Sequence, residues 1–132
     1  MKDAYDNEYD WEGKTILIVE DEEVSQYFFK KALKKTKAFL VIAKDGVEAV
    51  KMVKADEDID LVLMDIRLPN MDGLEATRLI KQISPELPVV AQTAYAQHSD
   101  REQALFSGCD DYITKPIKLE VLLAILDRHL FV

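Results

Sequence analysis

The chain has 132 residues, near the common size of one compact domain, so a single hydrophobic core is expected. Its 17 Lys and Arg residues against 25 Asp and Glu residues give a formal net charge of −8, which argues against binding to the nucleic-acid backbone. No apolar run approaches the roughly 20 residues of a membrane-spanning helix. The single cysteine, Cys109, cannot form an internal disulfide, and the N-terminus lacks the apolar stretch of a secretory signal. These features favour a cytoplasmic protein.

Residues 1–13 are polar and acidic, with aromatic residues such as Tyr9 and Trp11 interspersed and no helical or alternating period. This composition predicts an N-terminal tail or linker, although its aromatic side chains are able to pack on the domain. The domain itself is expected over residues 14–132, because no Gly, Ser or Pro-rich linker interrupts the chain beyond that point.

The first apolar run, at residues 15–19, is short, continuous and β-branched, as in a strand buried on both faces of a parallel sheet. It ends in four acidic residues. A helix is predicted next, because apolar residues recur at helical spacing and lysines gather near its end. The apolar residues at this spacing are Val24, Tyr27, Phe28, Ala32 and Leu33.

The same strand-to-helix unit recurs along the rest of the chain. Further strands are predicted at residues 40–43, 60–65, 88–91 and 111–114, and helices near residues 46–55, 73–83, 99–107 and from Leu119 onward. Strands that alternate with helices predict an α/β fold. In this fold five flanking helices cover both faces of a doubly wound, five-stranded parallel sheet through right-handed crossovers.

In such folds the functional site lies beyond the carboxyl ends of the strands. The residues delivered to that edge are Glu20 and Asp21 after the first strand, Asp65 after the third, Thr93 after the fourth and Lys115 after the fifth. Clustered carboxylates raise one another's proton affinity, so they need a counter-cation. Mg²⁺ is the natural candidate, because it prefers oxygen ligands and takes one or two carboxylates with phosphate oxygens. Alternatively, Lys115 neutralises Asp65 directly.

These residues are the parts that an aspartyl-phosphate site requires. Asp65 is the predicted acceptor, Glu20 and Asp21 the metal ligands, and Lys115 and the Thr93 hydroxyl the contacts of the phosphoryl oxygens. Each residue also has an ordinary structural explanation. The acids favour a helix N-terminus, Thr93 is typical of a turn, and Lys115 is typical of a solvated loop. Their convergence at one edge of the sheet favours the site.

The chain resembles the response-regulator receiver domains of two-component phosphorelay systems over almost all of residues 14–130. Four segments carry the resemblance: ILIVEDE at residues 16–22, LVLMDIRLPNMDG at 61–73, PVVAQTAYA at 88–96 and GCDDYITKP at 108–116. The resemblance implies the flavodoxin-like strand order 2-1-3-4-5. The style of these motifs is also similar to that of receivers attached to hybrid sensor histidine kinases, in which the N-terminal tail would serve as a linker.

The resemblance further implies Mg²⁺-dependent transfer of a phosphoryl group from a phosphohistidine to Asp65, followed by self-catalysed hydrolysis. The donor is a histidine kinase or a histidine phosphotransfer protein. The metal ligands implied are the acidic pair, Asp65 and the backbone carbonyl of Arg67. Glu20 stands where Asp is also common, and its longer side chain allows contact with the metal through water. Thr93 and Tyr112 are the implied switch residues.

Arg67 and Tyr95 flank the acceptor at positions that tune the lifetime of the phosphoryl group in the family. We expect them to slow attack by water through bulk and charge. If the wild type lost its phosphoryl group faster than an Arg67→Ala, Tyr95→Ala variant, this prediction would be wrong.

Since no output domain follows Val132 in this sequence, the expected output is contact with a protein partner. The resemblance places that contact on the fourth helix, the fifth strand and the fifth helix, around Tyr112 and the helix from Leu119. The sequence leaves the oligomeric state open, a homodimer included. Cys109 is expected to be a packed residue rather than a reactive thiol, since nothing basic adjoins it.

Three other functions fit parts of this pattern. The first is an interaction module of the same fold, switched by partner binding without phosphorylation; the presence of Asp65, Thr93 and Lys115 argues against it. The second is a phosphohydrolase of the haloacid-dehalogenase type, which places a second Asp two residues after the nucleophile, where this chain has Arg67. The third is a nucleotide-binding domain, which needs a Gly-rich loop where this chain is acidic.

Overall fold

A computed structural model of the protein describes residues 9–94, 102–105 and 107–131. Its centre is a parallel sheet of five strands in the order β2-β1-β3-β4-β5, which confirms the predicted order. The strands are β1 (Thr15–Val19), β2 (Phe39–Ala43), β3 (Leu61–Asp65), β4 (Val89–Thr93) and β5 (Asp111–Thr114). Strand order reverses between β1 and β3, so the acids after β1 and at the end of β3 meet at the switch point.

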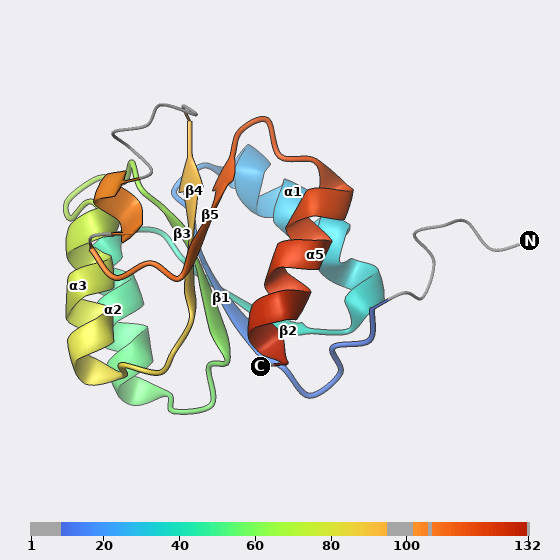
Figure 1. The fold of residues 1–132 in the computed structure, drawn as a ribbon, viewed down its shortest axis with the longest axis horizontal. Helices are drawn as coiled ribbons and strands as arrows, with labels where there is room; N and C mark the ends of the chain where they lie inside the picture. Colours follow the sequence, from blue (N-terminus) through green and yellow to red (C-terminus); the bar gives the residue numbers. More distant parts are fainter. Residues whose placement is uncertain (1–8, 95–101, 106, 132) are drawn as a thin grey trace, which may run out of the picture.

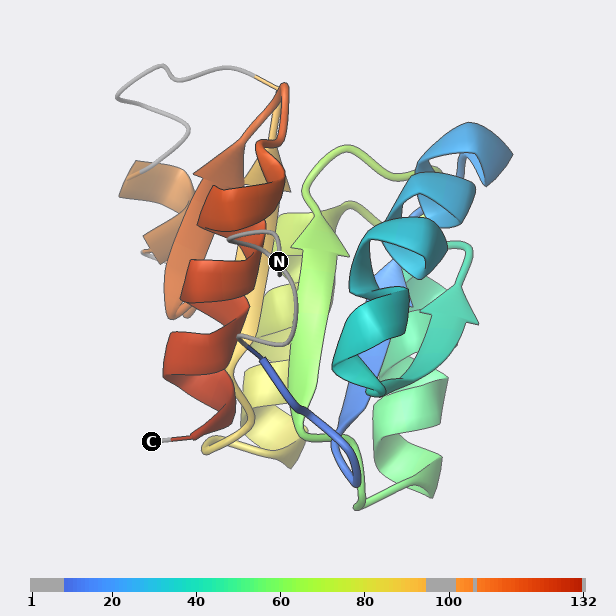
Figure 2. The same cartoon turned by 90° about the vertical axis from the view of Figure 1, so that its right-hand side faces the viewer.

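Helices cover both faces of the sheet. They are α1 (Glu23–Leu33), α2 (Gly46–Ala55), α3 (Gly73–Ile83) and α5 (Leu119–Leu130), and a 3₁₀ turn (Lys34–Thr36) follows α1. α1 and α5 lie on one face, and α2 and α3 on the other (Figure 1; Figure 2 shows the α1 and α5 face). Of the helix predicted near residues 99–107, residues 102–105 are helical, Ser107 lies in a turn, and residues 99–101 and 106 lie outside the described residues. Among the described helices, none has the length and apolarity to span a membrane.

The two helices that pack side by side on the second face, α2 and α3, begin at aspartate caps. The Asp45 side chain accepts a hydrogen bond from the Glu48 backbone N–H at 2.8 Å, and Asp72 accepts one from the Glu75 N–H at 2.9 Å. Each cap satisfies a donor that the first helical turn leaves unpaired. These caps fix where α2 and α3 start relative to the carboxyl edge of the sheet.

Alternation along the strands divides the core into two layers. In β1, Leu17 and Val19 pack with the α2 and α3 residues, whereas Ile16 and Ile18 pack with those of α1 and α5. Both sets are fully buried, as expected for a parallel sheet covered on both faces. Cys109 is also buried, and burial raises the pKa of its thiol to about 11, so the thiolate is disfavoured at neutral pH.

The predicted apolar face of α1 is wrong in part. Leu33 is buried as expected, but Val24 and Tyr27 are 81% and 64% exposed, and Phe28 is also exposed. The helix meets the sheet through Phe29 and Leu33 instead. A second apolar stripe is therefore left on the surface of α1.

Trp11, which belongs to the segment predicted as a tail, is fully buried. Its Nε1–H donates a hydrogen bond to Asp127 Oδ1 of α5 at 2.9 Å, and its backbone N–H donates to the Thr36 carbonyl. Tyr9 packs beside it, with ring centroids 5.7 Å apart. The packed part of the chain therefore begins before Lys14.

Candidate functional site

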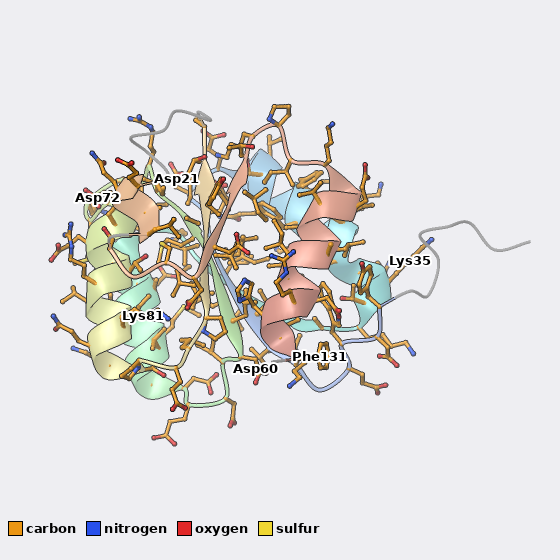
Figure 3. All side chains as sticks on the ribbon, viewed as in Figure 1. Asp21, Lys35, Asp60, Asp72, Lys81 and Phe131 are labelled. Carbon is orange, nitrogen blue, oxygen red and sulfur yellow. The ribbon has the colours of Figure 1, made fainter. Side chains whose placement is uncertain are left out.

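Three carboxylates meet at the carboxyl edge of the sheet. One oxygen from each of Glu20, Asp21 and Asp65 lies within 4.8 Å of the others. Glu20 and Asp21 directly follow β1, and Asp65 ends β3, the neighbouring strand. The structure thus brings together the three acids that the sequence assigned to metal binding. Figure 3 shows Asp21 at this end of the molecule and Asp60, which precedes β3, at the opposite end.

Glu20 is buried and held by the backbone around it. Its N–H donates to the Ala43 carbonyl at 2.9 Å, and its own carbonyl accepts from Gln26 Nε2 at 2.7 Å. Oε2 accepts from the Glu22 N–H at 3.3 Å, whereas Oε1 has no hydrogen-bond partner in the part of the chain that the structure describes. Burial, with smaller contributions from the charges of Asp65 and Asp21, raises the pKa of Glu20 to about 7.

The acids after β1 do not act as side-chain caps of α1. Glu22 occupies the N-cap position without a side-chain hydrogen bond to the first turn. Glu23 lies in that turn, where an acid is favourable to the helix dipole. Capping therefore does not account for the burial of Glu20, which points into the acidic cluster.

Asp65 is 5% exposed and has two different partners. Its Oδ1 accepts a hydrogen bond from the Arg67 N–H at 3.1 Å, and its Oδ2 lies 3.6 Å from Lys115 Nζ. Burial raises the pKa of Asp65, and the Lys115 ammonium opposes that rise. The predicted direct pairing of Lys115 with Asp65 is thus present, alongside the acidic cluster.

The segment that connects β5 to α5 begins with Lys115, whose backbone lies beside Thr93. The Lys115 N–H donates to the Thr93 carbonyl at 2.8 Å, and the Lys115–Pro116 peptide bond is cis. Thr93 is buried at the end of β4, paired in register with Thr114 of β5. Tyr112 is half-buried and packs against the core of the α2 and α3 face. Tyr95, predicted to tune the phosphoryl lifetime, lies outside the described residues.

Gly73 has a role that the sequence analysis did not assign. A Cβ atom at Gly73 would lie 2.2 Å from the Asp65 carbonyl oxygen, so only glycine permits this approach. The Gly73 N–H donates to the Ile66 carbonyl at 2.8 Å. The start of α3 therefore packs directly on the backbone of Asp65 and fixes its position; the signal in the sequence is a glycine directly after the Asp72 cap.

The surface next to the acidic cluster is hollowed. An open hollow of about 590 Å³ is lined by residues that include Asp21, Arg67, Asp72 and Gln103. It brings Asp21 and Arg67, both predicted site residues, to one concave surface open to solvent. The hollow thus gives solvent access to Asp21, next to the buried Asp65.

The donor set fits a hard divalent cation. Mg²⁺ prefers oxygen ligands and keeps several waters, and the cluster offers three carboxylates at a solvent-accessible edge. The buried Oε1 of Glu20, which has no partner in the described chain, is the kind of atom that a bound cation or its water satisfies.

Comparisons with known proteins agree with this geometry. The family model described as "Response regulator receiver domain" matches residues 16–127. A hybrid signal transduction histidine kinase (I) of Dictyostelium discoideum is 36% identical over 123 residues, which are 87% of this chain and 7% of that protein. The chain therefore spans a small part of this relative.

Solved structures give the same result. The receiver domain of the sensor histidine kinase PA1611 from Pseudomonas aeruginosa, with a magnesium ion coordinated in its active site cleft, is 38% identical with a TM-score of 0.83 over 89% of this chain and 98% of that one. The receiver domain of Ssk1 from Saccharomyces cerevisiae, solved with the histidine phosphotransfer protein Ypd1, is 32% identical with a TM-score of 0.83 over 89% of each chain. With its fold, its acidic cluster and the match over residues 16–127, the chain belongs to the family of response regulator receiver domains.

Proposed function

We propose that the chain accepts a phosphoryl group on Asp65 and switches a protein-interaction surface in response. The observation that carries this proposal is the environment of Asp65, a buried carboxylate with Lys115 Nζ at 3.6 Å and two further carboxylates beside it. A carboxylate in these surroundings can attack phosphorus, because Lys115 and a cation held by the acids would balance the negative charge of the phosphoryl oxygens.

Each residue of the site has a separate role in phosphoryl transfer. An Asp65 oxygen attacks phosphorus, an O–P bond forms, and the bond to the donor's imidazole nitrogen breaks, with its electron pair leaving on that nitrogen. The backbone N–H of Arg67 holds the other Asp65 oxygen in place. Lys115 and the Thr93 hydroxyl contact the phosphoryl oxygens and balance their charge. Hydrolysis by water later restores Asp65.

Glu20, Asp21, Asp65 and the Arg67 carbonyl are the proposed ligands of Mg²⁺. When bound, the ion supplies positive charge against the phosphoryl oxygens and lowers the repulsion between the carboxylates. Two observations support this assignment: the clustering of the three carboxylates and the Oε1 of Glu20, which no group in the described chain satisfies.

The proposed donor is a histidine kinase or a histidine phosphotransfer protein. The proposed output is contact through the fourth helix, predicted near residues 99–107, together with β5 and α5. Support for the donor comes from the similarity to a receiver solved with a histidine phosphotransfer protein. Thr93 and Tyr112 are the proposed switch residues, since Tyr112 lies in β5 and Thr93 ends β4, the strand paired with it. We propose a cytoplasmic location for the domain.

Intact-mass measurement after incubation with acetyl phosphate and Mg²⁺ tests the proposal. We expect an adduct of about 80 Da on the wild type and none on Asp65→Asn, because the amide oxygen of Asn is a poor nucleophile. Asp58→Asn is the matched control, since Asp58 is exposed in the loop before β3, away from the site. Removal of the metal with EDTA should abolish the adduct.

Two results would overturn the assignment. An adduct that persists on Asp65→Asn would place the phosphoryl group on another residue. Failure of the wild type to accept a phosphoryl group from either acetyl phosphate or a phosphorylated histidine phosphotransfer protein would favour the alternative, an interaction module switched by partner binding alone.

A further inference from the structure

Gln92 is a buried polar residue for which the fold gives no structural explanation. It lies in β4 with no exposed surface, and neither atom of its carboxamide has a hydrogen-bond partner within the described residues. Most buried polar groups in proteins are paired, because an unpaired one loses its hydration without compensation. An apolar side chain of similar volume would avoid this desolvation cost. The presence of an amide at this position therefore suggests that it has a function.

The sheet places Gln92 beside the acceptor. Asp65 of β3 and Gln92 of β4 are partners in register, and Gln92 is the partner of Ile113 of β5 on its other side. Neighbouring strands are about 4.8 Å apart, and side chains of partner residues leave the sheet on the same face. Val90, two residues earlier in β4, packs in the α1 and α5 layer, and so does Ile113. Gln92 and Asp65 therefore point toward this same layer.

The two carboxylate oxygens of Asp65 are held differently, and one of them can accept a further hydrogen bond. Oδ1 is held by the Arg67 backbone, whereas Oδ2 faces Lys115 Nζ at 3.6 Å, longer than a hydrogen bond. The Lys115 side chain is 36% exposed, and that of Asp65 is 8% exposed. The ammonium is thus free to move toward solvent while the carboxylate stays buried.

Transfer changes where the negative charge lies. A phosphoryl group on Asp65 carries its charge on its own oxygens, outside the buried end of the side chain, and a doubly charged group attracts the Lys115 ammonium more strongly than one carboxylate does. When Lys115 follows the charge, the buried end of Asp65 loses its cationic neighbour. Gln92 is the neutral donor next to it in the sheet.

We propose that Gln92 is a positioning residue of the phosphorylation site, whose Nε2 donates a hydrogen bond to Asp65 when Lys115 turns to the phosphoryl group. This inference rests on the proposed function. The buried Nε2 is unpaired in the unphosphorylated protein and gains a partner in the phosphorylated one, so it favours the phosphorylated state. A purely structural Gln92 would have no such dependence on phosphorylation.

The experiment compares Gln92→Met with Gln82→Met, the same change at an exposed position of α3. Intact mass gives the steady-state phosphorylated fraction in acetyl phosphate and Mg²⁺, and urea denaturation gives the stability. We expect Gln92→Met to be at least as stable as the wild type but to have a phosphorylated fraction at least threefold lower. Gln82→Met should match the wild type in both measurements.

NMR of the ¹⁵N-labelled wild type observes the Gln92 amide directly, which measurements of stability do not. The side-chain NH₂ signals of Gln92, assigned by through-bond spectra, should shift and exchange more slowly with water on phosphorylation, while those of Gln82 stay unchanged. Because this arm uses the wild type, it does not depend on the folding of any variant.

The outcomes separate the two proposals. A wild type that accepts no phosphoryl group overturns the proposed function and this inference with it. A phosphorylated wild type whose Gln92 NH₂ signals do not move overturns the inference alone, whatever the variant does. An equal phosphorylated fraction in Gln92→Met and the wild type also overturns it, since the amide then has no influence on the site.

Discussion

Glu20 and Asp21 are neighbours in the sequence but lie in opposite environments. Glu20 is buried, whereas Asp21 is exposed. Removal from water disfavours the charged carboxylate, so burial raises the pKa of Glu20 to about 7, and the charges of Asp65 and Asp21 add to the rise. At about pH 7 this carboxylate is therefore about half protonated in the folded protein, and ionising it fully costs free energy. A bound cation is the natural means of lowering that cost.

This cost predicts how stability depends on pH without a divalent cation. The pKa of Glu20 is about 7 in the folded chain against an ordinary value of 4.5, so the folded state binds the proton more tightly. The stability that protonated Glu20 contributes to the folded state is fully present below about pH 4.5, and it is lost as the pH rises through about 7. We expect Glu20→Gln to remove this loss and to be more stable than the wild type at about pH 8 by about 1–3 kcal/mol. Urea denaturation in EDTA at acid and alkaline pH measures it.

Glu23→Gln is the matched control, since Glu23 is exposed in the first turn of α1. It should keep the pH dependence of the wild type. Addition of Mg²⁺ should reduce the loss of stability in the wild type, because the ion binds the ionised carboxylates. If wild type and Glu20→Gln lose stability equally between acid and alkaline pH, burial of Glu20 does not have the proposed cost.

At the scale of the element, α1 shows what periodicity leaves undecided. Val24, Tyr27 and Phe28 have the spacing of a core face, but Phe29 and Leu33, four residues apart, have it too. The spacing tells which residues share a stripe and not which stripe meets the sheet. Packing against α5 and the sheet selects Phe29 and Leu33, which join the core, while the first stripe stays on the surface.

The exposed stripe predicts a contact with the phosphoryl donor. Val24 lies in the first turn of α1, three residues after Asp21, and Tyr27 follows one turn later. Exposed apolar side chains that lie together next to a functional site are typical of a protein-binding surface. We expect Val24→Ser, Tyr27→Ser to slow transfer from a phosphorylated histidine phosphotransfer protein by at least about fivefold, a loss of about 1 kcal/mol in binding. Rates of phosphoryl transfer are followed by intact mass.

Acetyl phosphate distinguishes this effect from damage to the site. A small donor needs no docking surface, so the same variant should react with it at the rate of the wild type. Phe39→Ser is the matched surface control, because Phe39 is 66% exposed at the start of β2, at the opposite end of the sheet. Equal slowing with both donors would show that the stripe supports the site and not the docking of a protein.

For the whole molecule, the sequence predicted the sheet and the edge where the site lies, but not the burial of Trp11 in the core. Continuous apolar runs bounded by acids suffice to place Glu20 and Asp65 at the carboxyl ends of strands, because both strands run the same way. Trp11 has no such pattern around it. Its partner Asp127 is 116 positions away, and local periodicity carries no information about a contact at that separation.

The N-terminal segment should therefore contribute to stability rather than act as a loose tail. Trp11 is fully buried in the α1 and α5 layer, so Trp11→Ala removes a large apolar contact and leaves a cavity. We expect it to lower the free energy of unfolding by about 3–5 kcal/mol. Trp11→Phe keeps most of the ring but leaves Asp127 without its donor, and should cost about 1–2 kcal/mol. Far-UV circular dichroism in urea follows both variants, since the only tryptophan is lost. Glu12→Ala, at an exposed neighbouring position, is the control and should change stability by less than about 0.5 kcal/mol. If Trp11→Ala has a similarly small effect, residues 9–13 do not stabilise the domain and are a tail.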